Sequence, residues 1–242
     1  MRTDLSIISD HDRHALALAM LDEDEHVEEV LGDLLEEAGQ DHYARGARQC
    51  VSSLRGRLEF TLAILPYRTA ALAACEFVDR ALSIMGREMP MRRMTLLRRV
   101  AELGRRIGSA ETPNQHMQIR MNLEDVRRWL RQPAPLEQAP QINGGMTNIP
   151  RCVVGFRSVM HLAVQVSRHE ATGDAKELDG SVRQLRRWVY RTTRAARNAA
   201  VNEQFRRSPS TGRRRIHDVE LQWQVDRARL LLHEILESQN VA

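Results

Sequence analysis

The stretch SVRQLRRWVYRTTRAARNAA at residues 181–200 decides the fold class of this chain. Its apolar and small residues recur at the three- and four-residue spacing that places side chains on one face of an α-helix, and arginines fill the opposite face. The inward-facing set is Leu185, Trp188, Val189, Thr192, Ala196 and Ala199. The segment contains no Pro, so the pattern predicts a long amphipathic helix over residues 179–205.

The remainder of the chain is also typical of helix. It is rich in Ala, Leu, Arg, Glu and Gln, which are strong helix formers, and no stretch alternates apolar and polar residues as a half-buried strand would. We therefore predict an all-α fold, a multi-helix bundle of about nine helices that is compatible with two helical subdomains. The expected helices are 10–21, 22–39, 41–65, 67–87, 91–107, a sixth that ends before Pro133, 150–170, 179–205 and 216–237.

Proline, glycine and charge divide the sequence into four parts. Residues 132–150 contain four prolines and the pair Gly144 and Gly145, so they form the clearest linker. The predicted organisation is an acidic helical pair at 1–42, a central helical bundle at 43–131, this linker, and a basic three-helix unit at 151–242.

Positive charge is concentrated on arginine and in the second half of the chain. Of 36 basic residues, Lys176 is the single lysine, and residues 181–215 hold eleven arginines against one acid, Glu203. Five arginines spaced by 4, 4, 3 and 3 residues follow one side of the 179–205 helix: Arg183, Arg187, Arg191, Arg194 and Arg197. At about 1.5 Å per residue they span about 20 Å, enough to follow several phosphates of a nucleic-acid strand.

The next segment continues the positive charge. Residues 206–215 read RRSPSTGRRR, with five arginines and no acid, and this composition predicts a mobile basic loop. Together with the helix, the loop arginines Arg206, Arg207, Arg213, Arg214 and Arg215 form the predicted nucleic-acid-binding set, and Tyr190 and Phe205 lie close enough to stack on bases. A secondary basic face is predicted at Arg92, Arg99 and Arg106, which recur every seven residues.

The first 42 residues carry the opposite charge, with thirteen acids and two arginines. Such a segment is able to contact a basic surface of the same chain or of another copy, which would produce head-to-tail assembly. The histidines His11, His14 and His26 lie among these acids, so a metal-dependent hydrolase is a remote alternative. The spacing matches no zinc-protease motif, and we assign no metal ligands.

Motifs of catalysis and cofactor binding are absent from the sequence. It contains no glycine-rich phosphate loop, no nucleophile elbow and no paired-cysteine motif, so we expect a protein that is not an enzyme and needs no cofactor. The three cysteines, Cys50, Cys75 and Cys152, are far apart and are expected to be free, mostly buried thiols. A charged start and interrupted apolar stretches indicate a cytoplasmic protein with no membrane partner.

Residues 14–48 resemble a short helical repeat-companion domain of planctomycete and related bacterial proteins. The points of likeness are Leu18-Ala19, Leu21, the acidic run 22–25 and the segment DLLEEAG at 33–39. The chain departs from that pattern at Leu34, where the family usually has Trp, and at Glu23, where it has Pro. The resemblance implies an interaction module without enzymatic activity.

These observations favour a non-catalytic helical subunit. Its expected partner is a nucleic acid, either RNA or single-stranded DNA, or a nucleoprotein, held by phosphate contacts that give affinity without sequence readout. The alternative is a protein-interaction adaptor or assembly component that binds an acidic protein surface as a homo- or hetero-oligomer.

Overall fold

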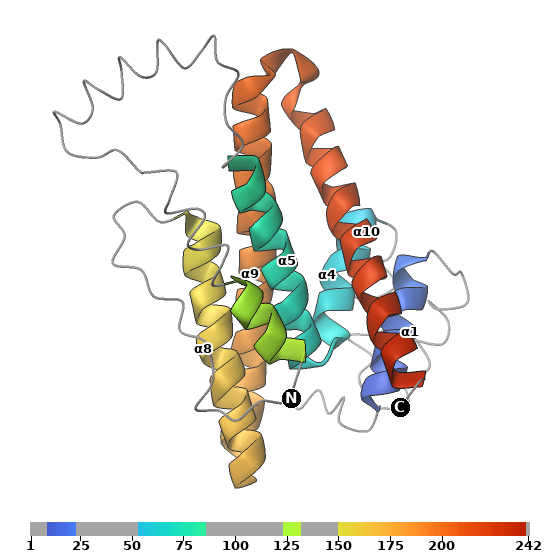
Figure 1. The fold of residues 1–242 in the computed structure, drawn as a ribbon, viewed down its shortest axis with the longest axis vertical. Coiled ribbons are helices and arrows are strands. Elements are labelled where there is room, and N and C mark those ends of the chain that lie inside the picture. Colours follow the sequence, from blue (N-terminus) through green and yellow to red (C-terminus); the bar gives the residue numbers. More distant parts are fainter. Residues whose placement is uncertain (1–8, 23–52, 86–122, 132–149, 241–242) are drawn as a thin grey trace, which may run out of the picture.

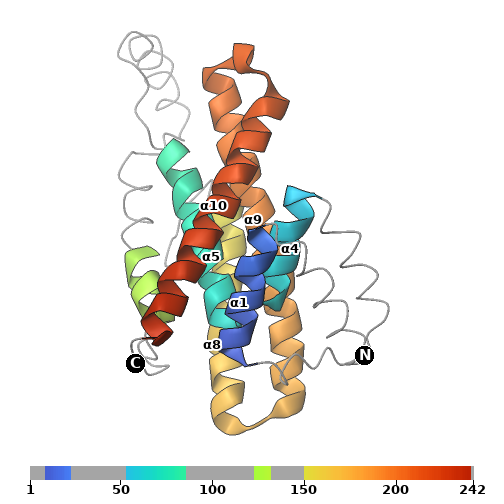
Figure 2. The ribbon, with the colours of Figure 1, turned by 90° about the vertical axis from the view of Figure 1, so that its right-hand side faces the viewer.

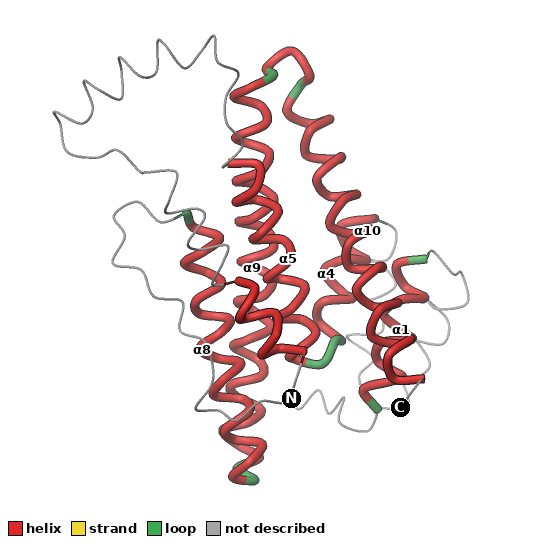
Figure 3. The backbone as a smooth tube through the Cα atoms, viewed as in Figure 1, coloured by secondary structure: helices red, strands yellow, loops and turns green. Residues whose placement is uncertain are grey.

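The computed structural model describes residues 9–22, 53–85, 123–131 and 150–240. Every secondary-structure element in these ranges is a helix, so the all-α prediction is confirmed (Figure 3). The predicted helices at 22–39 and 91–107 and the linker at 132–150 lie outside the described residues, except for Asp22, the C-cap of α1, and Pro150 at the end of the linker. The described residues contain seven labelled helical elements and a further helical segment at 123–131. They therefore test the predicted count of about nine helices only in part.

The first helix begins where its capping residue predicts. Helix α1 spans Asp10–Leu21, and the hydroxyl of Ser9 accepts a hydrogen bond from the Asp12 N–H at 3.1 Å. A side-chain oxygen at this position satisfies an amide that the helix itself leaves unpaired. Acids in the first turn, Asp10 and Asp12, also complement the helix dipole.

The prediction of one continuous helix over residues 41–65 is wrong, because the helix in the described part of this range begins only after Ser53. Helix α4 spans Leu54–Ile64, and Ser53 is its N-cap in an extended conformation, with its Oγ accepting from the Gly56 N–H at 3.0 Å. Serine has both a tolerable helix propensity and a strong N-cap preference, so sequence alone did not separate the two roles. As predicted, Pro66 ends this helix, and α5 follows at Tyr67–Met85.

The C-terminal half consists of three long helices. Helix α8 spans Arg151–Thr172, and Gly173 ends it in the left-handed conformation, at φ 71°, which glycine adopts without strain. Helix α9 spans Ala175–Arg207 and begins four residues before the prediction, because the Asp174 carboxylate caps it by accepting from the Glu177 N–H.

The predicted basic loop at 206–215 is mostly helical, which corrects the sequence interpretation. Arg206 and Arg207 form the last turn of α9, and α10, Arg213–Asn240, begins with the three arginines at 213–215. Only Ser208 to Gly212 connect the two helices, through the 3-10 helix η3, Pro209–Thr211. Arginine is a good helix former, so the basic residues extend the helices instead of interrupting them.

The long helices form an elongated bundle around α5 and α9. Helix α9 packs against α8 along one side and against α5 along another, while α10 packs against both α9 and α1. In Figures 1 and 2 the upper ends of α9 and α10 project beyond the other described helices and meet at η3. We call this projecting end, residues 206–215, the hairpin tip.

One hydrophobic core joins the described helices. It includes Leu21 from α1, Phe77 from α5, Phe156 from α8, Leu185 from α9 and Leu232 from α10, each at most 1% exposed. Helices from the predicted acidic, central and basic parts of the sequence all contribute to this core.

Helices α8 and α9 approach closely at Gly155. A Cβ built at this position lies 2.6 Å from the Oγ1 of Thr192, inside van der Waals contact, whereas a Cβ at Gly180 of α9 has no atom within 4 Å. The G155A substitution is expected to destabilise the fold by about 1–3 kcal/mol, because the Thr192 side chain or one of the two helices must shift to relieve the contact. The G180A substitution is the matched control and is expected to stabilise by about 0.5–1 kcal/mol, because alanine is the better helix former.

Urea unfolding of the two variants checks this expectation. Equal effects, or stabilisation by both alanines, would show that α8 and α9 are not in close contact at this position.

Candidate nucleic-acid interface on helix α9

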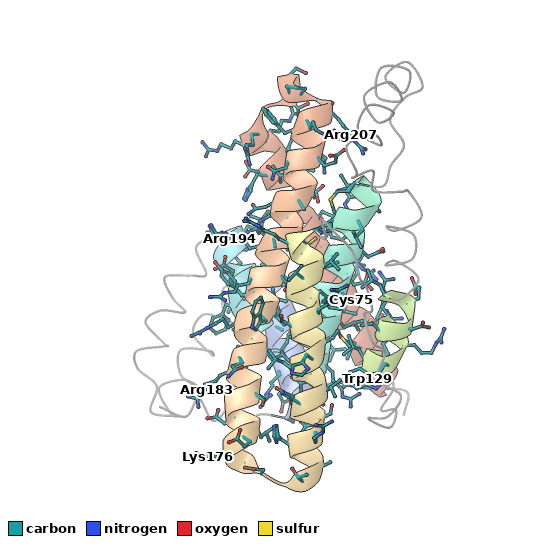
Figure 4. All side chains as sticks on the ribbon, turned by 90° about the vertical axis from the view of Figure 1, so that its left-hand side faces the viewer. Cys75, Trp129, Lys176, Arg183, Arg194 and Arg207 are labelled. Carbon is teal, nitrogen blue, oxygen red and sulfur yellow. The ribbon has the colours of Figure 1, made fainter. Side chains whose placement is uncertain are left out.

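Four of the five arginines predicted along one side of α9 lie on the surface. Arg183, Arg187, Arg191 and Arg194 are exposed, and Figure 4 shows Arg183 and Arg194 on the same side of the helix. Arg183 pairs with Asp179 at 2.9 Å, whereas Arg187, Arg191 and Arg194 contact no carboxylate within the described ranges. Within the described ranges, no ion pair neutralises the charge of these three residues.

The fifth residue, Arg197, is buried, which corrects the prediction of a continuous five-residue row. Arg197 is 4% exposed and donates to the Oε1 of Gln224 in α10 at 3.3 Å. Val201, which lies five helical turns after Arg183 and hence on the same side, is buried as well. Because α10 packs against the second half of α9, a side that faces solvent at 183–194 faces protein at 197–201.

The surroundings of Arg197 identify it as a structural residue. The amide of Gln224 accepts from Arg197 and donates to the backbone oxygen of Thr193 at 3.2 Å, so it links α9 and α10. Burial lowers the pKa of Arg197, and the nearby charge of Arg55 lowers it further. No ligand reaches a side chain that is enclosed in this way.

Arg191, Arg194 and Arg206 of α9 border a groove that the sequence did not predict. Arg183 and Arg187 do not line it. The groove has a volume of about 740 Å³ and lies between α9 and the beginning of α8. Its four arginines are Arg151, Arg191, Arg194 and Arg206, and we call it the α9 groove. The other lining residues are Met85, Pro150, Cys152, Tyr190, Ala195, Asn198, Ala199, Asn202 and Glu203.

The charge of the α9 groove is positive. The Arg191 guanidinium lies 5.4 Å from the centre of the Trp188 ring, a cation–π contact that orients it without neutralising it. Arg206 pairs with Glu203 at 2.8 Å, and Arg207 shares the same carboxylate at 2.8 Å. Burial opposes ionisation of Glu203, but the hydrogen bonds from Arg206 and Arg207 hold its pKa below the usual value. One carboxylate thus offsets one of the four lining arginines.

The beginning of α8 lines the same groove. Pro150 is the N-cap, has no side-chain acceptor, and receives the N–H groups of Val153 and Val154 on its backbone oxygen at 2.9 and 3.2 Å. The N–H groups of Arg151 and Cys152 precede these bonds at the positive end of the helix dipole. Helix N-termini of this kind favour anions such as phosphate.

The hairpin tip carries the rest of the predicted set. Arg206, Arg213, Arg214 and Arg215 are exposed, Arg207 is half-buried, and Arg213 donates to the side-chain oxygen of Asn202 at 2.6 Å. Helix α10 has no acid in its first turn, where a helix dipole favours acids and disfavours arginine. The three arginines at the start of α10 are therefore unfavourably placed with respect to the helix dipole.

The remaining predicted residues do not form a second site in the described part of the chain. Tyr190 lines the α9 groove, and its hydroxyl accepts a hydrogen bond from Arg55 at 3.2 Å. Tyr190 and Phe205 are both half-buried. Arg92, Arg99 and Arg106 lie outside the described residues. His11 bonds Gln239 and His14 bonds Thr69, and no group of three or more metal-ligating side chains occurs in residues 9–22, 53–85, 123–131 and 150–240.

Three polar or basic residues of the groove escaped sequence reasoning. Asn198 and Asn202 continue the exposed side of α9 at four-residue spacing before Arg206, and this periodicity would have found them. Arg151 is brought to the groove by the packing of α8 against α9, and no local pattern indicates it.

The described thiols are inert. Cys75 and Cys152 are free and buried, as predicted. Burial raises the pKa of Cys152 to about 11 and that of Cys75 still further, so neither forms a reactive thiolate near neutral pH.

Comparisons with protein-family models, curated proteins and solved structures found no match for this chain. A search of the described residues for membrane spans found no helix with the length and apolar character needed to cross a bilayer.

Proposed function

We propose that this protein is a non-catalytic helical subunit of the cytoplasm that binds the backbone of a single-stranded nucleic acid in the α9 groove. The observation that carries this proposal is the convergence of Arg151, Arg191, Arg194 and Arg206 on one groove with a single acid, Glu203. Arginine presents a planar fork of donors that matches phosphate oxygens, which favours phosphate as the bound group.

The shape of the surface supports a strand as the ligand. Three of the four groove arginines lie along α9 from residue 191 to residue 206, a rise of about 22 Å, and the rest of the hairpin tip continues the positive charge beyond residue 206. Asn198 and Asn202 lie between the arginines and have both donors and acceptors. The described residues that line the groove include no fully exposed aromatic ring, so binding is expected to rest on phosphate contacts and to discriminate little between sequences.

The salt dependence of binding tests the proposal. Fluorescence anisotropy with a labelled oligonucleotide of about 20 nucleotides is expected to show binding at about 50 mM salt. With four phosphates neutralised, the affinity should fall roughly 50-fold between about 50 and 200 mM salt, because counterion release gives a slope near −0.7 for each phosphate of a single strand.

Two outcomes would contradict it. Absence of oligonucleotide binding at about 50 mM salt would exclude nucleic acid as the partner. Sedimentation without nucleic acid that shows assembly at low salt and dissociation at high salt would favour the adaptor, in which the acidic segment of one copy binds the arginines of another.

A further inference from the structure

A second cavity lies at the base of the hairpin tip. It is lined by side chains of α5, α9, the connection at 208–212 and the first turn of α10. Its volume is about 290 Å³, near the lower limit of small-molecule sites, and we call it the tip pocket. Figure 4 shows Arg207, one of its lining residues, near the upper end of α9.

Four side chains that donate hydrogen bonds line the tip pocket from three elements. Arg80 belongs to α5, Arg207 ends α9, and Ser208 and Thr211 belong to the connection. The two hydroxyls are exposed and have no hydrogen-bond partner in the described part of the chain. Each hydroxyl can therefore donate to a bound anion.

The turn between α9 and α10 places both hydroxyls at the pocket. The Ser208 N–H donates to the Gln204 oxygen at 2.9 Å, and the Ser208 oxygen accepts from the Thr211 N–H at 3.2 Å. Side chains three residues apart in a 3-10 turn lie on the same side, so Ser208 and Thr211 point the same way. Ser210, which lies between them in the turn, does not line the pocket.

The acids beside the tip pocket are paired with its arginines. Arg80 donates through Nη2 to Glu220 at 3.2 Å, and the Glu220 side chain is 2% exposed. Arg207 donates to Glu203 at 2.8 Å and shares this carboxylate with Arg206. Neither carboxylate is among the described groups that line the pocket. Three guanidiniums and two carboxylates leave one positive charge in excess.

The set of donors favours the terminal phosphate of a monoester. Such a group has three unesterified oxygens and close to two negative charges near neutral pH, whereas the diester of a strand backbone has two such oxygens and one charge. Guanidinium forks match phosphate oxygens, and hydroxyls donate to an oxygen that the forks leave open. Two guanidiniums and two hydroxyls can therefore satisfy a monoester more fully than a diester uses them.

The tip pocket adjoins the α9 groove. Met85 and Arg206 line the groove, and the residues next to them in the chain, Ile84 and Arg207, line the pocket. A strand that lies along the groove thus ends close to the pocket.

We propose that the tip pocket binds the dianionic phosphate group of a phosphate monoester. The guanidiniums of Arg80 and Arg207 neutralise its charge, and the hydroxyls of Ser208 and Thr211 donate to its oxygens. The monoester has two sources, the phosphorylated end of a strand held in the α9 groove or a free small molecule. Only the first source rests on the proposed function.

Methyl phosphate is the probe that tests the tip pocket on the full chain. At about pH 8, where the monoester is a dianion, and at constant ionic strength, it is expected to shift the amide signals of residues 208–212 in nitrogen-15 spectra. The titration should give a Kd of roughly 1 mM. Dimethyl phosphate is the diester control and should bind at least about tenfold more weakly. Equal affinities for the two esters, or no shift at residues 208–212, would overturn the proposal.

A pair of variants localises the binding. The S208A/T211V variant removes both hydroxyls without a change of charge and should raise the Kd for methyl phosphate roughly tenfold, because two hydrogen bonds are lost. The S210A variant removes the exposed hydroxyl that does not line the pocket, and its Kd should be unchanged. An unchanged Kd in S208A/T211V would mean that the anion binds elsewhere and would contradict the proposal.

Oligonucleotides then separate the two sources. A strand with a phosphate at both ends is expected to bind roughly tenfold more tightly than the same strand with hydroxyl ends, and S208A/T211V should remove this difference. Equal affinities of the two strands, with methyl phosphate still bound, assign the tip pocket to a free monoester. Binding of methyl phosphate without binding of either strand would refute the proposed function and leave the tip pocket supported.

Discussion

Replacement of Arg191, Arg194 and Arg206 by glutamine in one variant is expected to weaken oligonucleotide binding roughly 100-fold at low salt, at about 1 kcal/mol for each lost phosphate contact. All three side chains line the α9 groove, and Arg191 and Arg194 are exposed without a carboxylate partner in the described part of the chain. Loss of Arg206 also removes one of the two arginines that pair with Glu203, so the carboxylate then pairs with Arg207 alone.

Two arginines outside the groove provide matched controls. The R197M substitution removes a guanidinium from the same helix, but from its buried side, and R128Q removes one that is 71% exposed on another helix. Both variants should keep the affinity within about threefold of the unmodified protein, since neither side chain reaches the groove. Equal losses in the triple variant and in either control would show that overall charge, and not the groove, binds the strand.

The second large effect concerns stability. Replacement of Arg127 by methionine is expected to lower the free energy of unfolding by about 3–5 kcal/mol, because it breaks a buried ion pair and leaves carboxylates without their partner. Arg127 is 12% exposed and bonds Glu76 at 2.9 Å, Asp79 at 3.0 Å and Glu124 at 2.5 Å. It thereby fastens the helical segment at 123–131 to α5.

The neighbouring residue is the control for this expectation. Arg128 pairs with Asp125 at 3.4 Å, but both side chains are mostly exposed, and such a surface pair contributes about 0–1 kcal/mol. Chemical unfolding of R127M and R128M should therefore separate the two by several kcal/mol. Similar values would mean that Arg127 is not held among the carboxylates, or that Arg227, which bonds Glu76 at 3.3 Å, compensates for its loss.

Local patterns were sufficient to predict that α9 forms and to predict the helix ends next to Pro66 and Gly173. The spacing of Leu185, Val189 and Thr192 identifies the buried side of α9, since each is fully enclosed in the structure. Pro66 and Gly173 act through backbone conformation alone, so the helix ends next to them follow from the sequence.

Tertiary packing decided what the sequence did not predict. Arg197 fits the exposed pattern of α9, and the helices packed against this part of α9 make it a buried residue that bonds Gln224 of α10. Arg151 stands at the start of a separate helix and joins the groove because α8 packs antiparallel to α9 across the turn at Gly173. A helical period describes one helix, so it contains no information on which neighbour covers which part of its length.

The most direct test of the α9 groove is the difference in salt slope between the unmodified protein and the triple variant R191Q/R194Q/R206Q. Plots of the logarithm of affinity against the logarithm of salt concentration should be linear for both. If the three arginines contact phosphates, the slope of the variant will be shallower by about 2, near 0.7 for each contact removed. Parallel lines would contradict the proposed interface, because they would show that these arginines release no counterions when the strand binds.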